Sequence, residues 1–132
     1  MSSVMSIAAS GMAAAERRLE VSARNVANVS TTGPLDAAPD DVRAAYAALR
    51  AEQTQTAGGG TAVNVTRASP ATIAVSDPAS PFANADGLVA APAVDLANEA
   101  VQQLVARYSF AANAAVMRAG DKMTKSLLNM TA

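Results

Sequence analysis

The feature that most constrains the fold is a pair of apolar stripes, one toward each end of the chain, separated by a segment that holds all six prolines. Between Val4 and Val29, small or apolar side chains recur every three or four residues, at Met5, Ala8, Met12, Ala15, Leu19, Ser22, Val26 and Val29. This spacing predicts one amphipathic helix. Gly33-Pro34 ends it, because glycine permits a left-handed cap and proline cannot continue a helix.

The second stripe follows Pro92 and predicts the longest helix of the chain, from Asp95 to about Met130. Its apolar positions step by three and four and then drift, which indicates a stutter that relaxes a supercoil; they are Val94, Ala97, Val101, Leu104, Tyr108, Ala111 and Ala115, then Ala119, Met123, Leu127 and Met130. Asp95 is a favourable N-cap, and Glu99 lies in the first turn, near the positive end of the helix dipole.

Residues 34–93 allow two interpretations. Apolar residues at helical spacing within Asp41–Glu52 favour a short helix. In contrast, Thr54-Gln55-Thr56 and the alternating run Val63-Asn64-Val65-Thr66 flank Gly58-Gly59-Gly60, which is typical of two strands around a glycine-rich turn. A further extended run covers residues 72–75. We favour the small β-hairpin region.

These patterns predict a mainly α protein with three parts: an N-terminal helical segment (1–33), a Pro/Gly-rich middle region with short strands (34–93) and a C-terminal helix (94–132). Because the middle region has to bring the ends of the helices together, we expect the two terminal helices to pack as an antiparallel hairpin or coiled coil. Alanine supplies much of the apolar content, and it buries little area per residue. We therefore expect part of the stability to come from neighbouring subunits.

The residue inventory argues against catalysis. The chain lacks histidine and cysteine, so the commonest general base and the thiolate nucleophile are both missing. Gly58-Gly59-Gly60 lacks the lysine and the Ser/Thr of a phosphate loop, and the acidic residues lack calcium-loop spacing. With a formal net charge of −1 and scattered basic residues, no nucleic-acid surface is expected. We predict no catalytic, cofactor-binding or metal-binding residues and no cofactor.

The candidate functional residues are instead contact positions on the two helices. For subunit packing we select Met5, Met12, Leu19, Val26, Val101, Leu104, Tyr108 and Met123. Packing within one monomer and packing between subunits remain equally open for each of them. For polar contacts that fix register we select Asn25, Asn28 and Asn113, because a buried asparagine in an apolar stripe can set the alignment of helices. Gly11 is a candidate for a close helix crossing, with a merely tolerated glycine as the alternative.

Two stretches of the N-terminal segment carry a family resemblance. Residues 7–12 (Ile-Ala-Ala-Ser-Gly-Met) and residues 25–33 (Asn-Val-Ala-Asn-Val-Ser-Thr-Thr-Gly) resemble the N-terminal signature of flagellar rod and hook proteins. Three stretches toward the other end are similar to the segment before the last helix, and to that helix, in the proximal-rod members: 77–92, 94–101 and 107–113. The sequence departs from the family at Pro34-Leu35, at Ala93 and over Asp36–Ala57.

The resemblance implies a structural subunit of the bacterial flagellar basal-body rod, in its proximal part, that assembles with itself and with other rod subunits into a helical tube used in motility. It also implies export through the flagellar type III apparatus to a periplasmic rod, and contact with the inner-membrane ring and export apparatus. No basic residue precedes the apolar run Val4–Ala15, so we expect neither a cleaved signal peptide nor a transmembrane segment. The alternatives are a non-flagellar coiled-coil adaptor and a divergent flagellar axial paralogue.

Overall fold

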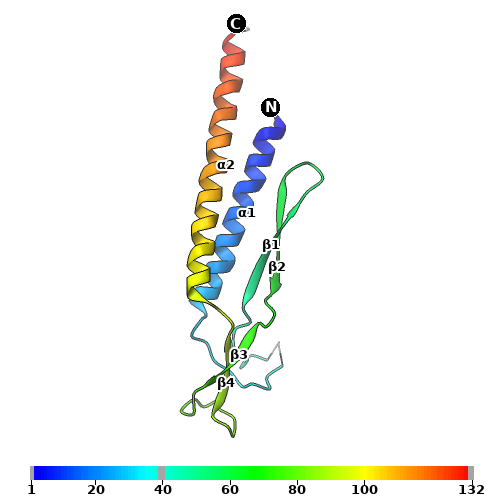
Figure 1. Ribbon diagram of the computed structural model, residues 1–132. Helices are drawn as coiled ribbons and strands as arrows, with labels where there is room; N and C mark the ends of the chain where they lie inside the picture. Colours follow the sequence, from blue (N-terminus) through cyan, green and yellow to red (C-terminus); the bar gives the residue numbers. More distant parts are fainter. Residues whose placement is uncertain (1, 39–40, 131–132) are drawn as a thin grey trace. The chain divides into compact units, whose positions relative to one another are not determined.

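The structure is a computed structural model that describes residues 2–38 and 41–130. Both terminal helices are present (Figure 1). In chain order the elements are α1 (Ser2–Ala27), β1 (Leu49–Gln55), β2 (Thr61–Arg67), β3 (Thr72–Ser76), β4 (Leu88–Pro92) and α2 (Leu96–Met130). The helices are 26 and 35 residues long, so the two apolar stripes correctly predicted the longest elements of the chain.

The ends of the helices follow from local hydrogen bonds. α1 ends at Ala27, and Gly33 has no positive φ, so the prediction that Gly33-Pro34 caps this helix is wrong. After Ala27 the chain continues in a turn, in which the Thr31 amide donates to the Asn28 carbonyl at 3.1 Å. At the start of α2, the Asp95 carboxylate accepts from the backbone amides of Ala97 and Asn98, at 2.8 and 3.3 Å. Asp95 is therefore the N-cap that the sequence predicts.

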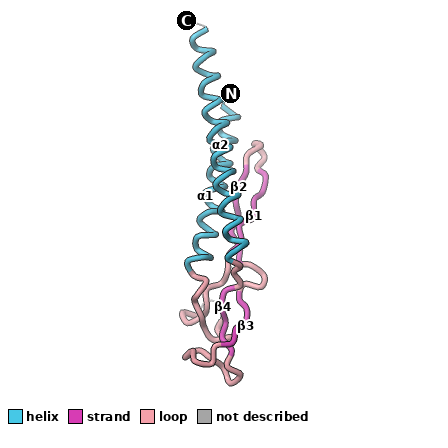
Figure 2. Tube along the Cα trace, turned by 60° about the vertical axis from the view of Figure 1, so that its left-hand side comes forward, coloured by secondary structure: helices cyan, strands magenta, loops and turns pink. Residues whose placement is uncertain are grey.

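The middle region contains two small two-stranded sheets (Figure 2). β1 pairs with β2 across the glycine-rich turn, in which Gly59 has a positive φ of 79°. The predicted hairpin is thus confirmed. The competing helix over Asp41–Glu52 does not form, because this segment passes through a turn and then enters β1. β3 pairs antiparallel with β4, in a register that runs from Thr72↔Pro92 to Ser76↔Leu88. No sequence pattern had indicated β4.

The chain divides into two compact units. The first combines Met1–Glu20, Ala51–Asn64 and Val101–Ala132, and the second combines Val21–Arg50 and Val65–Ala100. Small residues dominate both cores. The buried apolar residues are Ala8, Ala14, Ala15 and Ala106 in the first unit, and Val21, Ala45, Ala48, Val89 and Ala90 in the second. Each unit therefore buries little apolar area per side chain.

Candidate functional site

Within the first unit, small side chains occupy the buried positions of α1 and α2. Ala8, Ala15 and Ala106 are 1 %, 3 % and 1 % exposed, and Gly120 is also buried. The distance between packed helices depends on the side chains at their contact, so alanine and glycine allow a close approach of two backbones. We call the following set the inner seam: Ala8, Gly11 and Ala15 of α1, with Ala106, Asn113 and Gly120 of α2.

The contacts that join the helices of this unit include Met5 with Gly120, Gly11 with Asn113, and Arg18 with Gln102. The last of these is a hydrogen bond of 3.0 Å from the Arg18 guanidinium to the Gln102 side-chain oxygen. The two glycine contacts differ in tightness. A Cβ atom at Gly11 would lie 2.5 Å from Asn113 Oδ1, whereas a Cβ at Gly120 would lie 3.5 Å from Met5 Cε, which is an ordinary contact. Of these two glycines, only Gly11 cannot accept a Cβ atom unless the Asn113 side chain moves.

We expect Gly11→Ala and Gly120→Ala to change stability in opposite directions. Alanine gains about 1 kcal/mol over glycine in a helix interior, so Gly120→Ala should raise the free energy of unfolding. At Gly11 the new methyl group displaces the Asn113 side chain, which donates to the Ser109 carbonyl at 2.8 Å. Gly11→Ala should therefore lower the free energy of unfolding by about 1–2 kcal/mol.

Urea denaturation followed by circular dichroism measures both effects. Adding Asn113→Ala to Gly11→Ala should restore most of the loss, because the double variant removes the clash. Equal stabilisation by Gly11→Ala and Gly120→Ala would contradict this description of the inner seam.

The large apolar side chains selected from the stripes are mostly exposed. Six of the eight packing candidates are exposed, with these exposed fractions: Leu19 (39 %), Val26 (36 %), Val101 (54 %), Leu104 (49 %), Tyr108 (74 %) and Met123 (58 %). We call these six the outer apolar residues. Met5 and Met12 are partly buried. The contribution of all eight to subunit packing stays a prediction.

The inward positions of α1 coincide with the predicted stripe at three residues and differ from it by one residue at three others. Its buried or half-buried series is Ala8, Gly11, Ala15, Arg18, Ser22 and Asn25. The predicted stripe shares Ala8, Ala15 and Ser22, but alternates them with Met12, Leu19 and Val26. One residue corresponds to about 100° around a helix, so those three side chains lie to the side of the inward series. Apolar periodicity located the helix correctly, but small and polar residues occupy its inward face.

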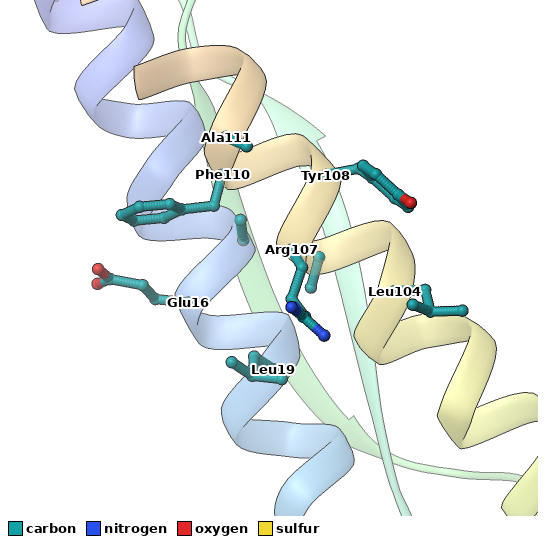
Figure 3. Close-up of a pocket in the computed structure, with 9 residues that line it drawn as sticks. Glu16, Leu19, Leu104, Arg107, Tyr108, Phe110 and Ala111 are labelled. Atoms are coloured by element: carbon teal, nitrogen blue, oxygen red, sulfur yellow. The ribbon is translucent and has the colours of Figure 1, made fainter. Parts of the chain in front are cut away.

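A groove with a volume of about 590 Å³ lies along the helices of the first unit (Figure 3). Glu16 and Leu19 project from α1, and Arg107, Tyr108 and Phe110 project from α2. The remaining lining residues are Ala15, Leu104, Ala106 and Ala111. The groove is thus mainly apolar, with one acidic and one basic side chain. Such a surface suits an amphipathic helix better than a small polar ligand.

Asn25, in the second unit, forms four side-chain hydrogen bonds to three other residues. Its side chain is 3 % exposed. Its amide nitrogen donates to the Leu49 carbonyl at 2.9 Å and to the Glu99 carboxylate at 2.7 Å. Its oxygen accepts from the Leu49 amide at 2.9 Å and from the Tyr46 hydroxyl at 3.1 Å. Burial raises the pKa of the Tyr46 phenol, which keeps that donor protonated at neutral pH. This single asparagine joins both helices, β1 and the segment before β1.

The other two asparagines behave differently. Asn28 donates to the Arg24 carbonyl of its own helix at 2.9 Å. Asn113 likewise donates within α2, and its side chain lies against Gly11. The register-setting role remains a prediction for all three. Sequence reasoning missed the Asn25 partners Tyr46 and Leu49, because they lie 21 and 24 residues away along the chain and meet Asn25 only through tertiary packing.

The described residues contain no group of three or more His, Cys, Asp or Glu side chains that could hold a metal ion. Among the described helices, none combines the length and the apolar character required to cross a membrane.

Comparisons with known proteins agree on one family. A family profile described as "Flagella basal body rod protein" matches residues 5–34, and one described as "Flagellar basal body rod FlgEFG protein C-terminal" matches residues 85–130. The flagellar basal-body rod protein FlgC of Salmonella typhimurium is 33 % identical, over 96 % of this chain and 95 % of that protein. FlgC of Yersinia enterocolitica is 34 % identical over 97 % and 92 %, and FlgC of Escherichia coli O157:H7 is 31 % identical over 96 % and 95 %.

Proposed function

We propose that this chain builds the proximal part of the flagellar rod through its terminal helices. The premise is that the chain belongs to the flagellar basal-body rod protein family and is a structural, non-enzymatic rod subunit. The observation that carries this proposal is the exposure of the outer apolar residues, while small residues fill the inner seam. A chain that keeps its large apolar side chains outside has contact surface to offer to neighbours.

In this proposal the two terminal helices of one subunit form an antiparallel coiled coil. The division into residues 1–33, 34–93 and 94–132 then separates two assembling segments from a middle region that contacts adjacent subunits. The outer apolar residues lie on both helices. One surface of a copy can therefore contact a different surface of the next copy. Such heterologous contacts that do not close generate a helical tube.

The remaining parts of the proposal concern the route and the neighbours. Rod family membership implies assembly with other rod components. We propose in addition that the chain leaves the cytoplasm through the flagellar type III apparatus without a cleaved signal peptide, and that it contacts the inner-membrane ring and export apparatus at the base of a periplasmic rod. Membership of the rod protein family argues against the non-flagellar adaptor. The deletion experiment described next distinguishes the proposed subunit from a divergent axial paralogue.

The test is an in-frame deletion of the gene, scored for swimming and for rods in electron micrographs of basal bodies. We expect a non-motile strain with missing or truncated rods, rescued by the wild-type gene. Val101→Asp should fail to rescue, with at least about a tenfold loss of swimming cells. The reason is that weakening a contact between subunits by about 1.4 kcal/mol or more lowers its association constant at least tenfold. Burying a carboxylate exceeds that cost.

Val101→Thr is the matched control, because it keeps the branched shape of a side chain that is 54 % exposed. It should restore swimming substantially, and purified Val101→Asp should keep the helix content of the wild type. Normal motility and intact rods in the deletion strain would remove the essential rod assignment and leave the paralogue.

A further inference from the structure

The inward face of α2 continues beyond Gly120 with larger residues. From Ala106 and Asn113 to Gly120 this face carries small or polar side chains that are buried or half-buried. The same steps of three and four lead on to Met123, Leu127 and Met130, which are 58 %, 54 % and 79 % exposed. The interface that α2 forms with α1 of its own unit is therefore continuous with an exposed apolar stripe. We call residues 121–130 the distal segment.

The groove of the first unit has an apolar lining that suits such a stripe. Its volume is about 590 Å³, and alanines at positions 15, 106 and 111 line it together with larger apolar side chains. Methionine side chains are flexible and fill irregular apolar surfaces, and the apolar face of a helix docks into grooves of this kind. The surface of the groove and the stripe of the distal segment are thus both mainly apolar.

Charges at the edge of the groove favour one orientation. Neither the Glu16 nor the Arg107 side chain, both of which line the groove, forms an ion pair or hydrogen bond with the described residues. In the distal segment Lys125 is paired with Asp121 at 2.7 Å, while the Lys122 side chain has no such partner among the described residues. Lys122 directly precedes Met123, and its long side chain can reach past the apolar stripe. Glu16 is the acidic group that such a lysine would meet in the groove.

We infer that the distal segment of one copy of this chain occupies the groove of a second copy, with Lys122 of the first copy near Glu16 of the second. This inference rests on the proposed function and names a specific contact between subunits. The two surfaces are separate parts of the chain, so each copy offers one groove and one distal segment. The contact is therefore heterologous and propagates from copy to copy.

Disulfide cross-linking tests this contact cleanly, since the chain contains no cysteine. Leu104→Cys places a thiol in the groove, and Leu127→Cys places one on the stripe. Both residues lie on α2, about 34 Å apart along the helix axis. A disulfide requires Cα atoms within about 7 Å, so the thiols introduced at positions 104 and 127 can join only between two copies.

The double variant Leu104→Cys/Leu127→Cys should give a ladder of dimers, trimers and larger species when basal bodies are oxidised and separated without reductant. Each single variant should give dimers at most. The matched control moves the second thiol to Asn129→Cys, about 200° around the helix from Leu127, and should yield at least about fivefold less of the ladder. An equal ladder with Asn129→Cys would overturn the inference, as would a cross-link to another rod protein in place of this chain.

A charge exchange gives an independent readout. Glu16→Lys should reduce the ladder severalfold, and the combination Glu16→Lys/Lys122→Glu should recover it. No recovery would overturn the pairing of these two residues. If the chain co-purifies with basal bodies but forms no ladder, the groove contact fails and the rod function stands. If it is absent from basal bodies, the proposed function itself fails.

Discussion

Asn25→Leu is expected to lower the free energy of unfolding by about 3 kcal/mol or more. The substitution keeps approximately the size of the side chain but removes both donors and both acceptor positions of a residue that is 3 % exposed. The Leu49 amide and carbonyl and the Tyr46 hydroxyl then lose partners at 2.9–3.1 Å. Each buried polar group left without a partner costs about 1–3 kcal/mol. Urea denaturation followed by far-ultraviolet circular dichroism measures the loss.

Asn28→Leu is the matched control for this prediction. Asn28 is the same residue type three positions further along the chain, but among the described residues its side-chain amide bonds only to the Arg24 carbonyl of its own helical end. Its replacement should change the free energy of unfolding by less than about 1 kcal/mol. Losses of similar size in both variants would show that Asn25 does not hold the second unit together.

Gly33→Ala is expected to be about as damaging, by a steric route. A Cβ atom at Gly33 would lie 2.5 Å from the Ala45 amide nitrogen and closer still to the Arg43 carbonyl oxygen. Both are backbone atoms, so no side-chain rotation can relieve the clash. Gly33 also exchanges two backbone hydrogen bonds with Ala90 of β4, at 3.1 and 2.8 Å. Moving the chain to accept a methyl group breaks this bridge, and we expect a loss of about 3 kcal/mol.

Gly58→Ala provides the comparison for Gly33→Ala, because a Cβ at Gly58 has no neighbour within 4 Å and the residue has no positive φ. It should leave the free energy of unfolding within about 1 kcal/mol of the wild type, or raise it slightly by restricting the unfolded chain. Thermal melting of the two variants side by side separates a requirement for glycine at position 33 from a general effect of glycine replacement.

The secondary structure was accessible from the sequence where its signals are local. Steps of three and four residues located both helices, Asp95 marked the start of α2, and the glycine-rich turn predicted the β1–β2 hairpin. β4 was missed because Leu88–Pro92 carries no polar–apolar alternation: Val89, Ala90 and Pro92 are all buried. A strand buried in this way has no period to detect.

The partners of the candidate residues were less predictable, for a different physical reason. The sequence identified Asn25 as a polar residue that could set register, but its hydrogen bonds reach Leu49 and Glu99, which are 24 and 74 residues away. Contacts over such separations depend on tertiary packing, which periodicity does not encode. Similarly, periodicity placed Leu19 and Val26 on the stripe with Ala8, Ala15 and Ser22, whereas Gly11, Arg18 and Asn25 occupy the inward positions between those three residues.

The contrast between the inner seam and the outer apolar residues separates two kinds of tolerance. Inside, a substitution is judged by volume, because a single methyl group at Gly11 meets Asn113. At the outer apolar residues, the polarity of a substitution decides its effect, and the effect is felt only in the contact with a neighbouring subunit. A purified subunit with an altered outer face can therefore melt, sediment and scatter light as the wild type does while being unable to join a rod. For such a chain, intact folding in isolation says little about fitness for assembly.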